Sequence, residues 1–307
     1  MTASAAASET STVTNHRCVN ALTVDVEDWF HANALAQAAP RDRWAGLDSR
    51  VVTNTRRLLE LFGQRGVTGT FFVLGWVADR EPALIREIAD AGHEIACHGY
   101  SHKLVFNQTP QEFREETQRA KTLIEQITGR AVEGYRASTY SITKRSLWAL
   151  DILCELGFAY DSSIFPIHHD QYGIPDAQPE PHQLTAPGGA HIVEFPLGFA
   201  RFGGMRLPVS GGGYFRLLPY WLTRAGLRQI NRKRQRPFAF YLHPWEIDPG
   251  QPRMKVSALS TFRHYTNLND CQNRLKRLMA DFSFAPMRKV LADLALLPAT
   301  APANPQA

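Results

Sequence analysis

The stretch Ala21-Leu-Thr-Val-Asp-Val-Glu-Asp28 joins a mostly apolar run to three carboxylates within four positions. The run over residues 21–26 predicts a buried β-strand. The carboxylates of Asp25, Glu27 and Asp28 then lie where this strand leaves the core, which is where α/β folds keep their chemistry. This stretch therefore predicts an enzyme.

Strand and helix signals alternate downstream of this stretch. Short β-rich runs predict further strands at 70–74, 93–97, 134–136, 158–161, 192–195 and 238–242. Helical patterns bounded by Pro, Thr or Gly lie between them, at about 49–64, 82–92, 109–129, 143–156 and 216–234. The alternation predicts an α/β fold with a largely parallel sheet, and the number of βα units favours a deformed (β/α) barrel over an open sheet. Three segments are expected to be irregular: a surface loop at 166–190, a glycine hinge at 211–213, and a loop at 256–266 before two final helices.

The two ends of the chain, residues 1–16 and 297–307, are expected to be disordered tails. Residues 17–296 are expected to form one barrel domain that includes a C-terminal helical extension. The first residues lack a basic segment followed by an apolar one, and no apolar run approaches the roughly 20 residues of a membrane span. We therefore expect a cytoplasmic protein that could contact the inner membrane peripherally.

The formal net charge of +5 is modest. Its basic clusters, at 224–236 and 274–277, are typical of solvated helix faces, or of a surface that favours anionic substrates or phospholipid headgroups. Nucleic acid is not expected as a partner, because no nucleic-acid-binding motif accompanies the charge. The four cysteines are far apart and form no C-x-x-C pair, which predicts reduced thiols. None of these features predicts an oligomeric state.

His98 and His102 are four residues apart and follow the strand predicted at 93–97 directly. On a first helical turn their two imidazoles would point the same way. A histidine pair of this kind beside carboxylates is the usual protein part of a hydrolytic metal site. The alternative is a pair of surface histidines.

The clustered carboxylates need a physical reason. Asp25 and Glu27 are two apart, so on an extended chain they face the same side. Two like charges at a buried strand end raise each other's pKa unless a cation neutralises them. A divalent metal held by one carboxylate and two histidines would do so, and it would leave the other carboxylate as a base. Otherwise the acids cap the following helix or pair with Arg136.

Four segments follow one another in a recognisable order: Asp25-Val-Glu-Asp28, His98-Gly-Tyr-Ser-His102, Arg136-Ala-Ser-Thr-Tyr140 and Leu242-His243. They resemble the NodB-type polysaccharide deacetylases, carbohydrate esterase family 4. That family carries an aspartate pair at its first strand end, then H-[ST]-x-x-H, an R-x-P-Y segment and a late L-x-H.

Five longer segments resemble a subgroup of this family tied to exopolysaccharide gene clusters of the exosortase (PEP-CTERM) type. They are Val24-Asp-Val-Glu-Asp-Trp-Phe30, Gly134-Tyr-Arg-Ala-Ser-Thr-Tyr-Ser-Ile142, Asp161-Ser-Ser-Ile-Phe-Pro166, His243-Pro-Trp-Glu246 and Arg263-His-Tyr-Thr-Asn-Leu268. The resemblance covers roughly residues 19–293, and it implies the deformed (β/α) barrel of the NodB type.

The resemblance also implies a metal site. A divalent ion, with Zn²⁺ favoured, would be held by Glu27, His98 and His102, polarise an acetamido carbonyl and lower the pKa of water. The wider family's D-D is spread here into D-x-E-D, so the carboxylate ligand is either Glu27 or Asp28. Strand alternation favours Glu27, because it keeps that side chain on the side of Asp25.

The remaining roles implied by the resemblance are proton transfers. Asp25 would act as general base, and Arg136 would keep it ionised and oriented. His243 would protonate the leaving amine, although a lone histidine after an apolar strand is often structural. A backbone N–H near 139–140 would stabilise the oxyanion. Ser138 replaces the family's usual proline, which loosens the loop without removing a catalytic group.

Aromatic residues near these motifs, Trp29, Tyr140 and Trp245, with Phe30 beside them, could form a floor for a sugar ring or an acetyl methyl. Core packing is nearly as good an interpretation for Phe30 and Trp245. Four further histidines are interpreted as unassigned surface residues: His31, His168, His169 and His182.

Together these features predict a metal-dependent N-deacetylase of exopolysaccharide biosynthesis. Its substrate would be an N-acetylated sugar in an oligosaccharide, a polymer or a lipid-linked precursor. Two alternatives stay open: a related amidohydrolase acting on a small cyclic amide, as in the allantoinase-like branch, and a catalytically silent carbohydrate-binding barrel.

Overall fold

The computed structural model describes residues 18–169 and 172–299 of the chain. The tail predicted over residues 1–16 lies outside this part, and so does most of the tail predicted over 297–307. The described part contains these strands: β1 (Val19–Val26), β2 (Thr70–Val73), β3 (Glu94–Cys97), β4 (Gly134–Tyr135), β5 (Tyr160–Asp161), β6 (His182–Thr185), β7 (His191–Glu194), β8 (Phe199–Phe202), β9 (Met205–Pro208), β10 (Ala239–Leu242) and β11 (Ser283–Ala285).

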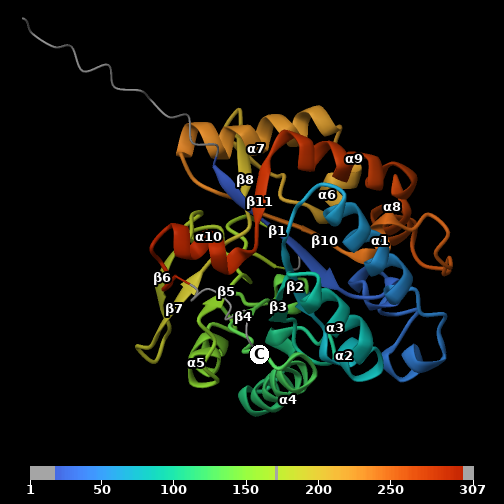
Figure 1. Cartoon of the computed structure of the whole chain (residues 1–307), viewed down its shortest axis with the longest axis horizontal. Helices are drawn as coiled ribbons and strands as arrows, with labels where there is room; N and C mark the ends of the chain where they lie inside the picture. The colour runs from blue at the N-terminus through green and yellow to red at the C-terminus, as the bar shows by residue number, and fades with distance from the viewer. Residues whose placement is uncertain (1–17, 170–171, 300–307) are drawn as a thin grey trace, which may run out of the picture.

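Most of these strands form one sheet, in the order β10-β1-β2-β3-β4-β5-β7-β6, with β11 paired to the beginning of β1. Neighbours in this sheet run parallel, apart from β6 and β7, which form an antiparallel pair. Leu197, just past β7, makes a parallel bridge to Ala239 of β10 and so brings the two sides of the sheet together. The result is the deformed (β/α) barrel predicted from the sequence, with strands at the centre of the molecule (Figure 1).

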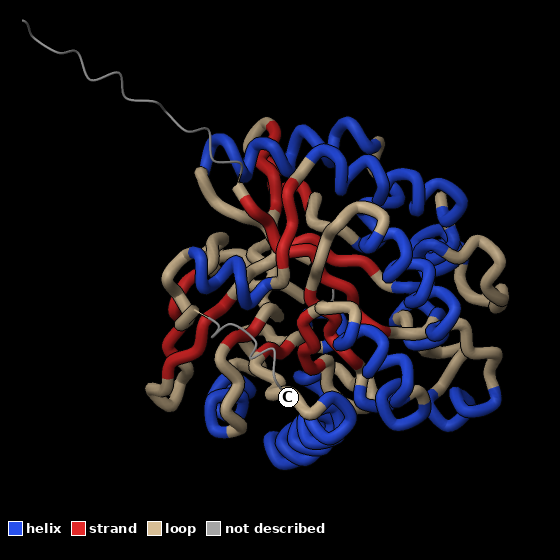
Figure 2. Tube along the Cα trace, viewed as in Figure 1, coloured by secondary structure: helices blue, strands red, loops and turns tan. Residues whose placement is uncertain are grey.

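Helices surround the strands (Figure 2). Their bounds are α1 (Val51–Gly63), α2 (Gly75–Arg80), α3 (Pro82–Asp90), α4 (Pro110–Thr128), α5 (Trp148–Glu155), α6 (Gly212–Leu217), α7 (Tyr220–Arg234), α8 (Ala258–Tyr265), α9 (Leu268–Asp281) and α10 (Met287–Asp293). In the part of the chain that the structure describes, no helix has both the length and the apolar character needed to cross a bilayer.

Helix α4 shows how local sequence sets the ends of these elements. Thr109 caps it, since its hydroxyl accepts from the Glu112 N–H while the Glu112 carboxylate accepts from the Thr109 N–H. Pro110 occupies the first turn, where a missing N–H is harmless, and Gly129 ends the helix in the left-handed conformation.

The alternation of β1 places the reactive end of the strand inside the barrel. Leu22, Val24 and Val26 pack in the large core shared with the surrounding helices. Ala21 belongs instead to the inner cluster of strand residues, and the Thr23 hydroxyl accepts from the guanidinium of Arg136 within it. Asp25 continues this inward series, because residues two apart share a face.

The irregular segments differ from the sequence prediction in three places. The prediction of a loop at 256–266 was wrong, because this segment contains α8. Ser257 caps α8 by accepting a hydrogen bond from the Ser260 N–H. The surface loop predicted at 166–190 includes β6, and the segment predicted as a flexible hinge begins α6. The helix expected from residue 143 starts at Trp148, because residues 143–147 form turns.

Candidate metal and catalytic site

Three buried side chains meet at the carboxyl end of the sheet. Glu27 follows β1, and His98 follows β3, which is separated from β1 only by β2. Glu27 Oε1 lies 2.8 Å from His98 Nε2 and 2.9 Å from His102 Nε2. Within the described residues, these three form a group whose ligand atoms all lie within 4.8 Å of one another. Parallel strands bring their carboxyl ends to one edge, so residues 71 positions apart become neighbours.

The donor set of this triad fits a divalent cation. His98 Nδ1 lies 2.8 Å from the Arg136 carbonyl oxygen, and a carbonyl only accepts, so Nδ1 carries the proton. In neutral His98 the Nε2 lone pair therefore points at a carboxylate oxygen. Two electron pairs face each other there unless a proton or a metal ion lies between them. One carboxylate and two imidazoles, one of them oriented by a backbone carbonyl, are the usual ligands of Zn²⁺.

Charge around Glu27 supports the same interpretation. Burial alone would raise the pKa of Glu27, but the nearby charges of His102 and His243 and hydrogen bonds from His102 and His98 hold it well below the usual range. The carboxylate is therefore ionised and ready to bind a cation.

His102 reaches the triad through a loop and not through a helix. The expected helical turn after His98 was wrong, since residues 98–104 have no helical structure. Gly99 at φ 71° and His102 at φ 53° instead turn the chain back toward Glu27. A left-handed histidine stores about 1–3 kcal/mol of strain, and Arg41 helps to hold it by donating to the carbonyl oxygens of Ser101 and His102.

Asp28 is directed away from the histidines. Its Oδ1 accepts from the Trp29 N–H, and its Oδ2 accepts from the Ser49 hydroxyl and from the N–H groups of Arg50 and Val51. These donors are the first residue of η1 (Trp29–His31), the two residues before α1, and the first residue of α1. The structure thus brings Glu27 to the two histidines and gives Asp28 the capping role that was the alternative for the cluster.

Asp25 and Arg136 form a buried ion pair inside the barrel. Arg136 Nη1 lies 2.7 Å from Asp25 Oδ1, and the same nitrogen donates to Thr23. The guanidinium also donates to the carbonyl and the hydroxyl of Ser162 and lies 4.0 Å from the Phe72 ring centroid. Burial alone would lower the pKa of Arg136, but the Asp25 charge raises it. With Oδ1 paired to Arg136, Oδ2 is oriented toward His243, at 3.9 Å from Nε2.

His243 follows β10 and is supported by two residues that the sequence did not single out for a role. Its Nδ1 lies 3.2 Å from Glu246 Oε2, and Glu246 Oε1 accepts from Arg216 Nε at 2.7 Å. Arg216 and Glu246 are almost completely buried. Burial alone would lower the pKa of His243, but the charge of Glu27 and the hydrogen bond and charge of Glu246 raise it to about 9. Burial would raise the pKa of Glu246, but Arg216 and His243 lower it to about 2.

The signal for Glu246 was present in the His243-Pro-Trp-Glu246 segment, where a carboxylate three residues after a histidine can reach back to it. Arg216 had no comparable signal. It lies at the end of α6, and its other donors bind the carbonyl oxygens of residues 263, 264 and 266 at the end of α8.

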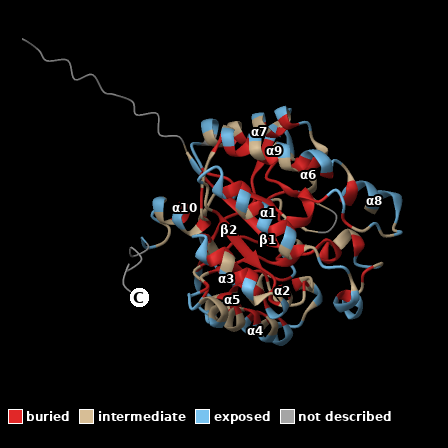
Figure 3. Ribbon diagram, turned by 45° about the vertical axis from the view of Figure 1, so that its right-hand side comes forward, coloured by how far each residue is buried: buried red, intermediate tan, exposed pale blue. Residues whose placement is uncertain are grey.

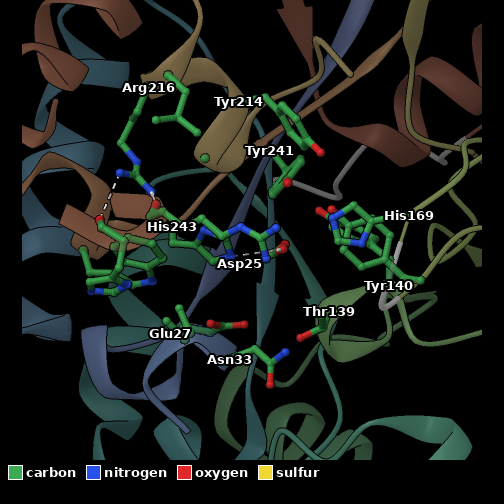
Figure 4. A pocket seen from close by; sticks show the side chains of 18 of the residues that line it. Asp25, Glu27, Asn33, Thr139, Tyr140, His169, Tyr214, Arg216, Tyr241 and His243 are labelled. Atoms are coloured by element: carbon green, nitrogen blue, oxygen red, sulfur yellow. Dashed lines mark hydrogen bonds and ion pairs between the residues drawn. The ribbon is translucent and has the colours of Figure 1, made fainter. Parts of the chain in front are cut away.

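A cavity of about 360 Å³ is lined by five of these side chains: Asp25, Glu27, His102, Arg216 and His243. Figure 4 shows Asp25 and His243 at its centre, Glu27 below them, and Tyr140 and His169 across from Arg216. Of the aromatic residues predicted to contact substrate, Tyr140 and Trp245 line the cavity. Trp29 is not among the residues that line it: its ring packs against Phe30, and its Nε1 donates to the Asp48 carbonyl oxygen.

The backbone beside Tyr140 is also unusual. Thr139 and Tyr140 have φ values of 55° and 53°, in the left-handed region that residues other than glycine rarely adopt. The Tyr140 N–H donates to the Ala137 carbonyl oxygen at 3.0 Å. Thr139 is at the cavity wall.

The histidines left unassigned have different positions. His31 is buried, so its interpretation as a surface residue was wrong: its Nδ1 accepts from the Asp28 N–H, and its ring packs against Trp44 and Trp76. His169 lines the cavity, and His168 is exposed.

Comparisons with known proteins divide the chain at β5. Residues 42–160 match the polysaccharide deacetylase family, and residues 162–292 match a domain of unknown function, DUF3473. The boundary falls within one sheet, because β7 of the second part pairs with β5 of the first and β10 pairs with β1. Asp25 and Glu27 precede the first match, and His243 lies in the second.

Two curated relatives illustrate the similarity. A peptidoglycan deacetylase of Helicobacter pylori is 32% identical over 114 residues, which are 37% of this chain and 37% of the relative. A chitooligosaccharide deacetylase of a Bradyrhizobium species is 30% identical over 157 residues, 51% of this chain and 64% of the relative. The chain thus spans 36% to 40% of the first three curated relatives' lengths.

Two crystal structures share the fold. A Mycobacterium smegmatis protein described as a polysaccharide deacetylase has a TM-score of 0.59 at 24% identity, covering 93% of both chains. Puue allantoinase has a TM-score of 0.58 at 16% identity, covering 92% of both chains.

Proposed function

We propose that this chain is a metal-dependent hydrolase that removes acetyl groups from N-acetylated sugars during exopolysaccharide biosynthesis. The observation that carries the proposal is the convergence of Glu27, His98 and His102 beside Asp25, which is paired to Arg136, and His243, which is held protonated. The polysaccharide deacetylase match over residues 42–160 and the deacetylase relatives support the same activity.

In this proposal a divalent ion, with Zn²⁺ favoured, binds to Glu27, His98 and His102. When bound, such an ion supplies Lewis acidity to an amide carbonyl and makes water a better nucleophile at neutral pH. The His98 Nδ1 hydrogen bond fixes the ring so that Nε2 faces the ion site.

Asp25 and His243 divide the proton transfers of amide hydrolysis. Asp25 Oδ2 takes the proton of the attacking water, while Arg136 binds Oδ1 and orients the carboxylate. The C–N bond then breaks, and the His243 imidazolium gives a proton to the departing sugar amine. Acetic acid and a free amine are formed, and the acid ionises to acetate by giving its proton to the amine or to solvent. The proton held by Asp25 can return to His243, whose Nε2 is 3.9 Å away.

Backbone and aromatic groups complete the proposed site. Since the Tyr140 N–H is engaged with Ala137, we assign the developing oxyanion to the Thr139 N–H. Tyr140 and Trp245 supply apolar surface for the sugar ring or the acetyl methyl. Trp29 is not given a direct contact, because it is not among the residues that line the cavity.

We also propose that residues 17–296 form one barrel domain with a helical extension. Shared pairing of β1 with β10 and of β5 with β7 supports this arrangement. A cytoplasmic location, peripheral membrane contact and the exosortase subgroup stay predictions.

The experiment is metal analysis and acetate release by the purified protein on N-acetylglucosamine oligomers and lipid-linked precursors. We expect about one equivalent of metal, lost in His98→Ala, and no acetate release from His98→Ala or Asp25→Asn. His191→Ala, at an exposed position of β7, is the matched control. Metal without acetate release would favour the small-amide hydrolase. Sugar binding without metal or turnover would favour the silent barrel.

A further inference from the structure

The catalytic cavity has a neighbour with different chemistry. A groove of about 640 Å³ lies between α8 and the segment that begins at η2 (Asn33–Leu35). It shares four lining residues with the catalytic cavity: Asn33, Ala34, Leu259 and Arg263. A substrate whose acetamido group lies in the catalytic cavity can therefore extend into this groove, which we name the second groove.

The lining of the second groove does not resemble a site for more sugar units. Apart from the shared residues it consists of Ala36, Gln37, Ala38, Lys255, Val256, Ser257 and Ser260. None of these described residues is aromatic, so the groove has no flat ring on which a sugar could stack. None is acidic, so it also lacks carboxylates that accept from sugar hydroxyls. Its charges are the cations Lys255 and Arg263, which favour an anionic group.

The outer edge of α8 adds an apolar region beside these cations. Leu259 and Phe262 are 57% and 55% exposed, lie three residues apart on the helix, and both line the catalytic cavity. Figure 3 shows that the outer part of α8 and the loop before it are largely exposed. Two large apolar side chains at the mouth of a polar site are suited to contact a lipid chain or its bilayer.

We propose that the substrate is an N-acetylated sugar joined through a phosphate or diphosphate to a lipid. The sugar occupies the catalytic cavity, the phosphate lies against Lys255 and Arg263 in the second groove, and the lipid contacts Leu259 and Phe262. This assignment rests on the proposed deacetylase function and names its substrate class. The cations and the apolar side chains lie together beside the catalytic cavity, as the phosphate and the lipid of such a molecule follow its sugar.

The test compares acetate release from three synthetic substrates of N-acetylglucosamine: a neutral methyl glycoside, the 1-diphosphate, and the diphosphate bearing a farnesyl chain. We expect kcat/KM to rise in that order. Lys255→Gln should raise KM about fivefold for the two charged substrates at unchanged kcat, and should leave the neutral one unaffected. Arg263→Gln should raise KM more for the charged substrates than for the neutral one, because Arg263 also lines the catalytic cavity. Higher salt should have the same selective effect. Lys289→Gln, an exposed lysine of α10, is the control.

The lipid portion has its own variants. Leu259→Ser and Phe262→Ser should raise KM for the farnesyl substrate much more than for the lipid-free diphosphate, on which they act only as part of the cavity wall. Since both side chains are more than half exposed, the variants should keep the melting temperature of the wild type. An equal effect on both charged substrates would overturn the lipid assignment.

The outcomes separate this inference from the proposed function. If the neutral glycoside is hydrolysed as well as the charged substrates, and Lys255→Gln changes neither, the phosphate assignment is overturned while the deacetylase stands. If none of the three substrates releases acetate from the metal-loaded wild type, the deacetylase function itself is refuted for this sugar, and the assignment fails with it.

Discussion

Replacing Glu246 by glutamine should shift the pH dependence of catalysis without removing a group that touches substrate. Glu246 contributes a hydrogen bond and a negative charge that help to raise the pKa of His243 to about 9. A cation at Glu27 would weaken that residue's contribution, which leaves Glu246 as the main support of the imidazolium. Glutamine keeps the shape but lacks the charge, and it has one acceptor oxygen in place of two, so it can accept a hydrogen bond from only one of His243 and Arg216.

The size of the effect follows from the charge on this hydrogen bond. Hydrogen bonds to charged groups contribute about 1.5–3 kcal/mol, against about 0.5–1.5 kcal/mol for neutral ones. The loss of the long-range attraction between Glu246 and His243 adds to this difference. At 1.36 kcal/mol for each pKa unit, the pKa of His243 should fall by about 1–2 units. At pH 8.5 the protonated fraction would then drop about three- to twenty-fivefold, while at pH 6 it would change little.

The assay is the pH profile of kcat/KM between pH 5 and 10, with an NMR titration of the His243 imidazole. Glu155→Gln, at an exposed ion pair with Arg114, is the control for loss of one carboxylate. Glu246→Gln leaves Arg216 buried without an anionic partner, which can destabilise the fold. The unfolding free energy of this variant is therefore measured first, at pH 6. A descending limb at the wild-type pH, or an equal loss of activity at every pH, would refute the role of Glu246.

Three further predictions concern metal, acid stability and packing. Glu27→Gln should lose the bound metal. Asp28→Asn should keep the metal but lower the unfolding free energy by about 1–3 kcal/mol, because it weakens the capping hydrogen bonds. Metal analysis and urea unfolding test these effects, and metal loss in Asp28→Asn but not in Glu27→Gln would make Asp28 the ligand. Burial lowers the pKa of His264 to about 3 from 6.5, so below pH 6.5 the unfolded chain binds a proton that the folded chain does not. The unfolding free energy should therefore fall by about 2 kcal/mol as the pH is lowered from 7 to 5. If His264→Gln shows the same dependence of unfolding free energy on pH as the wild type, this prediction is wrong. Gly211 has φ 127°, and in Gly211→Ala the new Cβ would lie 1.8 Å from a carbonyl oxygen of β10. Urea unfolding should therefore show an unfolding free energy lower by about 3 kcal/mol or more. The control Gly63→Ala, whose Cβ would have no atom within 4 Å, should leave the unfolding free energy nearly unchanged.

The barrel could be predicted because its signals are local. Strand β1 is an apolar run, and α4 carries its own capping residues, so each element can be recognised without its neighbours. The segment at 256–266 was the exception. Its helix α8 exposes Leu259 and Phe262, so apolar residues lie on its outer side and the usual inward periodicity is missing.

The residue types of the candidate site could be predicted from the sequence, but their arrangement in space could be predicted only in part. Spacing and chemistry pointed to His98 and His102, yet the two rings converge through a left-handed loop and not through a helical turn. Arg216 could not be found in this way, because its partner Glu246 lies 30 residues away on another element. No periodic pattern links positions at that separation.

The βα alternation, and the carboxylates and histidines at strand ends, can be read from the amino-acid sequence, because hydrophobic periodicity and turn residues act within a few positions of the chain. That Glu27 meets the two histidines while Asp28 accepts hydrogen bonds at the start of α1 follows from the folded arrangement, since it depends on how β1, β3 and α1 lie in space. The folded arrangement likewise produces the support of His243 and the groove beside the catalytic cavity. Closing the barrel sets these neighbours, and closure is a property of the whole sheet and not of any segment.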